Sequence, residues 1–501
     1  MGSVGSQLLR RRESGIADPC PEPGAQAGTS YGSDNHKRRR RSPSLGPESE
    51  NSRSHLDPED NLQQLVSRNH HKKVKLASEY AYQTLFLNGD SSDIKIRALG
   101  KEWCLHKIFL CQSGYFATML RASGNESQED VINLEINDPN IDVDSLHFAL
   151  GSLYNHDYVF REPLQVPGVL AAACLLQVED LLYQCDKNMK ETINEKTVCG
   201  YYAAAETYGL ESVKTRCFEW LLHNLMTHPS VELFKELSID LMNQLISSSN
   251  LLVMQKEIDV YTTVKKWMFL RLNPTWNGTT SQLLVNANNW FFRHKEHVGN
   301  IAFLETERGI AFQPVFKNLR FQHIICGQVS IRVIERDALI PSQWLSSLFK
   351  QQWFTWLRAK LCREIWPRYT NEREFEKGSM RCGKMIVTDG EYAWRWSVSN
   401  FCFPLCVIFT RNYIIFKQHT FTHSGDGSVC SYPLRKIAFR LTLAHFDSSG
   451  NLSFSKTTGY QILTIQNDEE KVVMELDSTA LSFPCYIFCN FLFMPLENPE
   501  N

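Results

Sequence analysis

Residues 92–120 read SDIKIRALGKEWCLHKIFLCQSGYFATML, and this stretch decides the fold of the first domain. Ile94 and Ile96 alternate with charged residues, which predicts a short strand with one buried face. Gly100 provides a turn, and residues 103–105 are typical of a returning strand. The apolar residues after His106 suit two short packed helices separated by a break at Ser113–Gly114.

Three strings within this stretch resemble a BTB domain, also called a POZ domain. They are Asp93-Ile-Lys-Ile, Leu105-His-Lys-Ile-Phe-Leu110 and Ser113-Gly-Tyr-Phe-Ala-Thr-Met119. The resemblance implies that Asp93 and His106 are buried polar residues that hold the strand to the first helices, since buried polar groups need hydrogen-bond partners. It also implies an interaction module that usually forms homodimers and often holds a cullin.

Composition predicts a globular protein of two or three domains. The chain has 501 residues, 43% of them hydrophobic, and its net charge of −2 argues against a general nucleic-acid coat. The 15 cysteines show no zinc-type spacing, so we expect reduced, mostly buried thiols. The apolar run 483–496 is broken by Pro484, Asn490 and Pro495 and is too short to span a bilayer, so we expect a soluble intracellular protein.

Residues 1–77 are rich in Ser, Gly, Pro, Arg and Glu and predict a disordered basic tail. Gly2 and Ser6 fit the myristoylation pattern, which would give peripheral membrane contact. Two basic clusters are candidates for nuclear import, with a solvated basic tract as the alternative. Their residues are Lys37, Arg38, Arg39, Arg40, Arg41, Lys72, Lys73 and Lys75.

Residues 78–186 complete the expected BTB/POZ domain. Residues 78–87 predict a helix with Tyr82, Leu85 and Phe86 on one face, and the resemblance places the dimer contacts there. A strand over 131–136 and helices over 142–154 and 169–182 follow.

Residues 187–345 predict a helical domain that resembles a BACK domain, with an insertion at about 271–316. The segment 211–226 carries one apolar face, and a second stripe between Val260 and Met268 suits the core better than a ligand box. Residues 346–379 predict the rest of an aromatic helix that starts near 343, followed by a charged linker. That helix either docks two domains or presents an aromatic binding face.

Residues 380–496 switch to a period of two and predict a small antiparallel β-sandwich or barrel. They show no six-fold repeat of the kelch type. The expected class is therefore α+β: a BTB/POZ domain, a helical BACK domain and a C-terminal antiparallel β-rich domain.

The whole order is similar to the germ cell-less family. The resemblance rests on segments such as Cys199-Gly-Tyr-Tyr202, Leu233-Phe-Lys-Glu-Leu-Ser238 and Asp389-Gly-Glu-Tyr-Ala-Trp-Arg-Trp396. It implies a cullin-3 substrate adaptor with a nuclear, nuclear-matrix or nuclear-envelope location and a role in germ-cell formation or spermatogenesis. It also implies a lamina-associated polypeptide and a DP-type transcription factor as partners.

The expected cullin contacts are Tyr115, Met119, Gly124 and Glu126. Cullin-binding BTB domains carry a hydrophobic–x–Glu motif in the loop after this helix, and here Gly124 stands at the hydrophobic position while Glu126 is retained. Loss of such an anchor would remove about 2 kcal/mol of binding free energy. Two hypotheses therefore stay open: a cullin-3 adaptor with weakened binding, or a non-ligase scaffold at the nuclear envelope.

The sequence carries no pattern typical of an enzyme. His294 and His297 lie three apart and Cys104 lies close to His106, but no phosphate loop, nucleophile elbow or HExxH motif accompanies them. We expect no catalytic residues, no cofactor and no metal.

Overall fold

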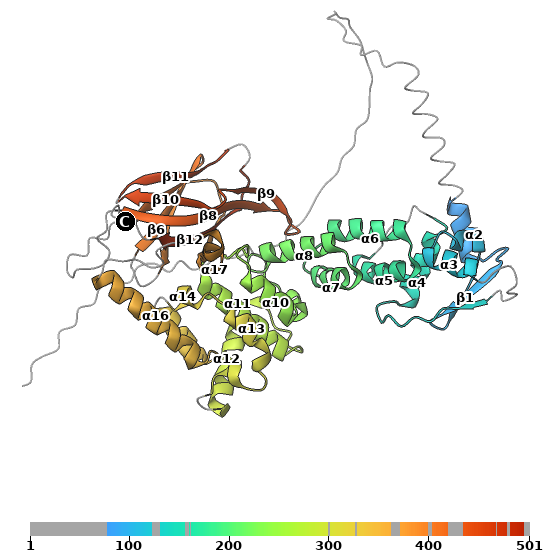
Figure 1. The fold of residues 1–501 in the computed structure, drawn as a ribbon, viewed down its shortest axis with the longest axis horizontal. Helices are drawn as coiled ribbons and strands as arrows, with labels where there is room; N and C mark the ends of the chain where they lie inside the picture. Colours follow the sequence, from blue (N-terminus) through green and yellow to red (C-terminus); the bar gives the residue numbers. More distant parts are fainter. Residues whose placement is uncertain are drawn as a thin grey trace, which may run out of the picture. The chain divides into compact units, whose positions relative to one another are not determined.

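The computed structural model describes residues 78–122, 131–155, 160, 162–298, 301–325, 328–361, 371–398, 403–418, 434–466, 468–477 and 481–494. Helices dominate the chain up to residue 378, and antiparallel strands follow (Figure 1). The expected α+β class is confirmed. No helix within these ranges is long and apolar enough to cross a membrane.

The first domain contains a three-stranded sheet in the order β2-β1-β3. Its strands are β1 (Ile94–Ala98), β2 (Lys101–Leu105) and β3 (Val131–Asn133). β1 is antiparallel to β2 and parallel to β3. Ile94, Ile96 and Ala98 alternate with exposed residues, so one face of β1 lies in the core. Gly100 makes the turn with a φ of +78°, as its position in the sequence predicted.

Helices cover this sheet and extend the domain. They are η1 (Ala81–Leu87), α2 (Lys107–Leu110), α3 (Gly114–Ala122), α4 (Val143–Ser152), η3 (Pro163–Gln165), α5 (Val166–Leu176) and α6 (Glu179–Glu191). A capping box between Asp142 and Ser145 starts α4. The single helix expected over 169–182 is wrong: α5 ends at Leu176, and Gln177 takes a left-handed conformation with a φ of +53°.

His106 is a buried structural residue, but its partner is not Asp93. Its Nδ1 lies 3.1 Å from the Tyr154 hydroxyl, and its Nε2 lies 2.9 Å from the carbonyl oxygen of Asp90. Asp93 is exposed, and its Oδ1 accepts a hydrogen bond from the backbone N–H of Lys107 at 2.8 Å. Asp93 therefore ties β1 to α2 as expected, although the two polar side chains do not satisfy each other.

The second region is helical. Its elements are α7 (Val198–Tyr208), α8 (Glu211–Asn224), α9 (Val231–Glu236), α10 (Ile239–Ser247), α11 (Glu257–Leu272), α12 (Thr280–Val298), η4 (Phe303–Glu305), η5 (Ile310–Phe312), α13 (Gln313–Lys317), α14 (Phe321–Ile324) and α15 (Gln328–Asp337). The predicted apolar stripes of α8 and α11 are confirmed as core. Gly209 ends α7 with a φ of +77°. One hydrophobic cluster runs from Phe86 to Leu345 and joins this region to the first domain.

Two more helices precede the strands. α16 (Ser342–Leu361) is continuous across residue 345, the boundary expected from the sequence. α17 (Glu372–Gly378) lies within the stretch expected to be a linker, and a capping box between Asn371 and Glu374 starts it. Phe375 of α17 is fully buried, because it packs against Ala438, Met494 and Tyr460. Residues 371–378 are therefore part of the folded structure.

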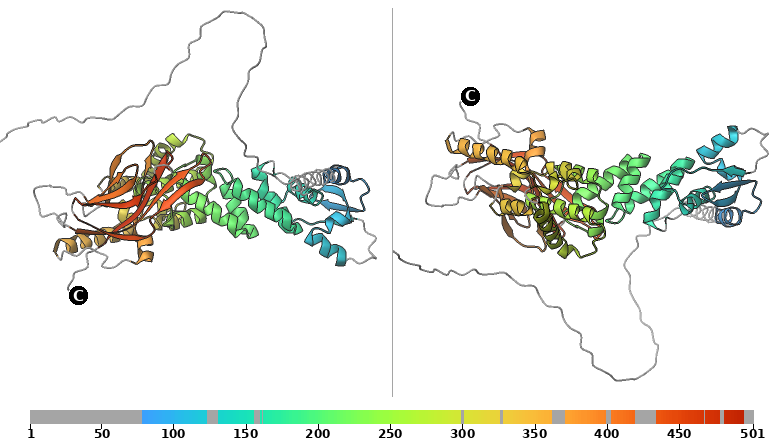
Figure 2. Two further views of the ribbon diagram at one scale, coloured as in Figure 1. Left: turned by 90° about the horizontal axis from the view of Figure 1, so that it is seen from above. Right: turned by 90° about the horizontal axis from the view of Figure 1, so that it is seen from below.

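The C-terminal strands form a β-sandwich, as one of the two predicted alternatives. They are β4 (Met380–Ile386), β5 (Tyr392–Val398), β6 (Phe403–Phe409), β7 (Tyr413–Gln418), β8 (Leu434–Phe446), β9 (Leu452–Thr457), β10 (Gln461–Gln466), β11 (Glu470–Glu475) and β12 (Cys485–Met494). One sheet has the order β10-β8-β12-β4 with β9 beside β8, and the other has the order β11-β7-β6-β5. Their inner faces share one core, in which the rings of Phe416 and Phe439 lie 5.1 Å apart. Figure 2 shows these strands from two further sides, in orange and red.

One strand departs from the predicted alternation. Val472 and Met474 are two residues apart and would share a face in a regular strand, but the β7–β11 register shifts between them. Val472 is 53% exposed whereas Met474 is buried. The irregularity places the two side chains on different faces.

A buried ion pair joins the sandwich to the helices. Arg381 of β4 donates from Nε and Nη2 to the two carboxylate oxygens of Glu257 in α11, at 2.9 and 3.0 Å. Its Nη1 donates to the backbone carbonyls of Ile246 and Ser248. Both charged side chains are at most 1% exposed. Burial alone would raise the pKa of Glu257, but Arg381, together with Arg320 and His323, outweighs this effect and the pKa is lowered.

Further hydrogen bonds extend this interface. Arg320 donates to the backbone oxygens of Glu376 and Ser379, and Asn490 donates to the carbonyl of Ser249 at 2.8 Å. The Nδ2 of Asn224 in α8 donates to the carbonyl of Gly450, which lies at the tip of the β8–β9 hairpin, at 2.8 Å. The helices and the sandwich are thus bonded at several separate points.

The described cysteines are free thiols, most of them buried. Cys382 and Cys489 face each other across β4 and β12, and the Sγ of Cys382 donates to the carbonyl of Cys489. Burial raises the pKa of the Cys485 thiol to about 11. Such thiols are poor nucleophiles, which fits a structural role.

Replacement of Tyr154 by Phe will destabilise the first domain. The Tyr154 hydroxyl accepts a hydrogen bond from the backbone N–H of His106 at 2.9 Å and also bonds its ring nitrogen. Loss of the hydroxyl leaves buried polar groups of His106 without a partner, which lowers the free energy of unfolding by about 1–3 kcal/mol. We expect a lower urea midpoint for Tyr154→Phe and no change for Tyr183→Phe, which lies at a 66% exposed position. Equal midpoints for the two variants would contradict this role.

Replacement of Arg381 by Met will destabilise the protein by about 3–5 kcal/mol, because it leaves the charge of Glu257 buried and unpaired. Urea unfolding measures the effect, and the double variant Arg381→Met/Glu257→Leu should recover most of the loss. Arg411→Met is the matched control, since its partner Asp389 and Arg411 itself are both exposed. A loss as small as that of the control would show that the buried pair is unimportant.

Candidate protein-interaction site

Helix α3 is held in place by polar contacts with the α5–α6 turn. The hydroxyl of Ser113 donates to the carbonyl of Leu176 and accepts from the N–H of Phe116, so it caps the helix. The N–H of Gly114 donates to the carbonyl of Gln177 at 3.2 Å. A Cβ on Gly114 would lie 2.7 Å from the side-chain oxygen of Gln177, so α3 begins close to the α5–α6 turn.

Tyr115 and Met119 lie one turn apart on α3, and both side chains are half-buried. Phe116, between them, is fully buried and anchors the helix in the core. The rings of Tyr115 and Phe116 meet edge to face with their centroids 5.3 Å apart. Spacing of four residues places Tyr115 and Met119 on the same side of the helix, where part of each remains accessible.

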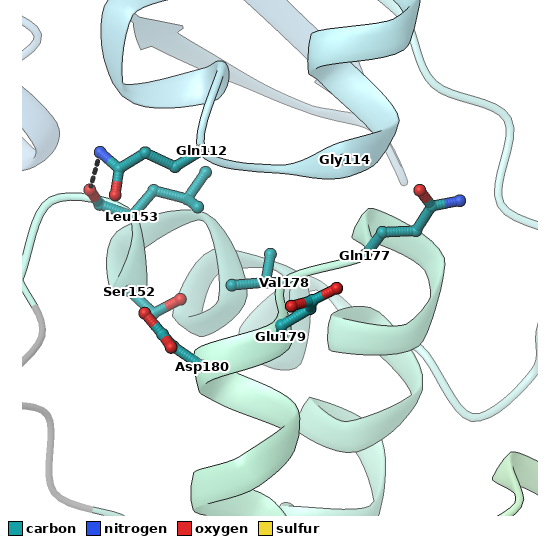
Figure 3. Close-up of a pocket in the computed structure, with 8 residues that line it drawn as sticks. All are labelled: Gln112, Gly114, Ser152, Leu153, Gln177, Val178, Glu179 and Asp180. Carbon is teal, nitrogen blue, oxygen red and sulfur yellow. Dashed lines mark hydrogen bonds between the residues drawn. The ribbon is translucent and has the colours of Figure 1, made fainter.

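A cavity of about 290 Å³ lies beside the start of α3 (Figure 3). It is formed by the α2–α3 turn, the end of α4 and the α5–α6 turn. Its lining residues are Gln112, Gly114, Ser152, Leu153, Gln177, Val178, Glu179 and Asp180.

The lining of this cavity is polar and carries carboxylates but no cation. Gln112 is held by a hydrogen bond from its Nε2 to the carbonyl of Leu153 at 3.1 Å. Glu179 and Asp180 stand on the first turn of α6, where carboxylates are favoured by the helix dipole. This cavity therefore suits a hydrogen-bond donor or a cation of a protein partner.

The sequence did not predict this cavity. Gln112, Ser152, Gln177 and Asp180 come from separate elements, and residues 169–182 were expected to form one helix without a turn. No Gly or Pro marks the turn at Gln177, so the local signal that would have revealed it is missing.

Of the three predicted dimer residues, one lies in the core. Phe86 is 4% exposed and packs against His147 and Tyr154 within its own domain, so it is a core residue. Tyr82 and Leu85 are half-buried on the same helix, and their role in a dimer stays a prediction. Gly124, Glu126, Gly2 and the predicted import residues lie outside the described residues.

Within the described parts of the chain, no group of three or more His, Cys, Asp or Glu side chains could hold a metal ion. The ring of His294 stacks on Trp290 with the ring centroids 5.7 Å apart, and it meets Phe303 edge to face. His106 is bonded to Tyr154 as described above. These histidines have structural surroundings.

Comparison with known proteins identifies the domains and the family. The model of the BTB/POZ domain matches residues 82–193, and the model described as "BTB And C-terminal Kelch" (BACK) matches residues 198–283. Germ cell-less protein-like 2 of Mus musculus is 54% identical over 501 residues, which cover all of both chains. Germ cell-less protein-like 1 of Homo sapiens is 57% identical over 87% of this chain and 85% of its own length.

A more distant relative extends the same match. Protein germ cell-less of Drosophila melanogaster is 31% identical over 89% of this chain and 82% of its own length. These matches run through the BTB/POZ domain, the BACK domain and the C-terminal sandwich. The chain therefore belongs to the germ cell-less family of BTB–BACK proteins.

Proposed function

We propose that this protein is a non-enzymatic substrate adaptor of a cullin-3 ubiquitin ligase. The observation that carries the proposal is the accessible face of α3, with Tyr115 and Met119 beside the α5–α6 cavity, in a chain with BTB and BACK domains. In this role α3 and the α5–α6 turn contact the cullin. The protein supplies no catalytic group and acts by bringing the substrate close to the ligase.

The sandwich is the proposed substrate-binding part. The strand registers place Ala393, Ile408, Ile415 and Val472 in one row across its four-stranded sheet. Val472 and Ala393 are exposed, and the two isoleucines between them are half-buried. An accessible apolar row of this kind supports recognition of a protein segment.

A scaffold without ligase activity is the second candidate, and Gly124 is the observation that favours it. A glycine at the hydrophobic position of the cullin-binding loop provides no side chain to insert into a partner. In this role the protein tethers a lamina-associated polypeptide or a DP-type transcription factor at the nuclear envelope.

Location, assembly and biological role follow from the family resemblance and the basic tail. We propose a nuclear, nuclear-matrix or nuclear-envelope protein that acts in germ-cell development or spermatogenesis. Homodimers would use Tyr82 and Leu85 of η1, since Phe86 is committed to the core. Gly2, if acylated, would add peripheral membrane contact.

A binding titration against the cullin-3 N-terminal domain tests the adaptor function. We expect the full-length protein to bind, and the double variant Tyr115→Ala/Met119→Ala to bind at least about tenfold more weakly because interface anchors contribute about 2 kcal/mol or more. Gly124→Trp should tighten binding by a similar factor. Ile108→Ala is the matched control, since Ile108 is 77% exposed on α2.

The full-length chain is required for this titration. A fragment that ends near residue 345 would lack Arg381, the ion-pair partner of Glu257, and with it the whole interface between the helices and the sandwich. Binding that appears only in Gly124→Trp would exclude the adaptor function for the native protein and leave the scaffold.

A further inference from the structure

Helix α16 (Ser342–Leu361) has an exposed aromatic face next to its packed face. Leu345 is buried against the helical core, whereas Phe349, Trp353 and Phe354 are 36%, 57% and 51% exposed. Positions 349 and 353 lie one turn apart and share a side of the helix. Position 354 lies about 100° further round the axis, so the three rings form one broad face. Their accessible surface amounts to about 300 Å², a patch of the size that commonly marks a binding site.

The charge of this helix is entirely positive. Lys350 is exposed within the aromatic face, and its Nζ lies 5.9 Å from the ring centroid of Phe354. From Ser342 to Leu361 the sequence contains no Asp or Glu, and its charged residues are Lys350, Arg358 and Lys360. Lys350 therefore gives the exposed face a positive charge, which complements an anionic surface.

The packed face fixes the helix on the protein. Trp344 and Leu348 pack against the helical core, and Lys317 lies over the ring of Trp344. The Nε2 of Gln352 donates to the carbonyl of Gln322 in α14. Because α16 is already folded and anchored, its exposed rings can bind without the entropic cost of forming a helix.

We propose that the face formed by Phe349, Lys350, Trp353 and Phe354 binds the surface of anionic lipid bilayers. Helices that lie in the bilayer interface combine Trp, Phe or Leu with Lys or Arg and bind through both apolar burial and charge. Tryptophan is enriched at this depth, and each basic residue near an anionic surface contributes about 1 kcal/mol. The face combines three exposed aromatic rings with one exposed lysine, which is the combination that such interfacial helices present.

Sedimentation with lipid vesicles tests the proposal. The full-length protein, produced without N-terminal acylation, is mixed with phosphatidylcholine vesicles with and without phosphatidylserine. We expect binding to the phosphatidylserine vesicles, and a loss of at least about tenfold in partition coefficient for Trp353→Ser/Phe354→Ser, because both rings leave the interface. Lys350→Glu should weaken binding and reduce its salt dependence.

Two controls separate this face from other parts of the chain. Phe292→Ser on α12 removes a ring of similar exposure, 50%, and should leave vesicle binding unchanged. The basic N-terminal residues are identical in all variants, so a difference in vesicle binding comes from the changed face. An unchanged urea midpoint for the double variant would show that it is folded.

Equal vesicle binding by the wild type and the folded double variant would overturn the proposal. Equal losses for Phe292→Ser and the double variant would also overturn it, since binding would then reflect general surface hydrophobicity. The cullin-3 titration does not depend on this face, so either proposal can fail without the other.

Discussion

The buried pair of Arg381 and Glu257 constrains the rest of the structure. A charge removed from water is tolerated only when its partners are correctly placed. The guanidinium of Arg381 bonds the carboxylate of Glu257 and the carbonyls of Ile246 and Ser248, so it fixes strand β4 against the ends of two helices. A shift of the sandwich along the helices would leave at least one of these groups unpaired.

This constraint bears on function because it makes the position of the sandwich specific. Two further residues of the helical region bond this part of the chain at points separate from Arg381. Arg320 donates a hydrogen bond to the carbonyl of Ser379, and Asn224 donates one to the carbonyl of Gly450. A Cβ on Gly450 would lie 2.4 Å from the side-chain oxygen of Asn224, so the hairpin tip fits this helix closely. An adaptor that acts by proximity gains from such fixed geometry, whereas a simple tether does not need it.

Local periodicity predicted most of the fold. The alternation around Ile94 and the apolar faces of α8 and α11 are all properties of short segments. The pairing of Glu257 with Arg381 spans 124 positions, and each residue alone looks like an ordinary surface charge. The cavity beside α3 was missed for the same reason: its walls come from elements far apart in the sequence, and the turn at Gln177 has no local signal.

Helix α16 shows why some alternatives cannot be resolved from sequence. Its aromatic residues were expected either to dock two domains or to form a binding face, and the two roles were treated as alternatives. In the structure Leu345 is buried while Trp353, two turns later, is 57% exposed. When apolar residues occur all round a helix, their spacing does not mark one side as the buried side. Packing with neighbouring elements decides which side is covered.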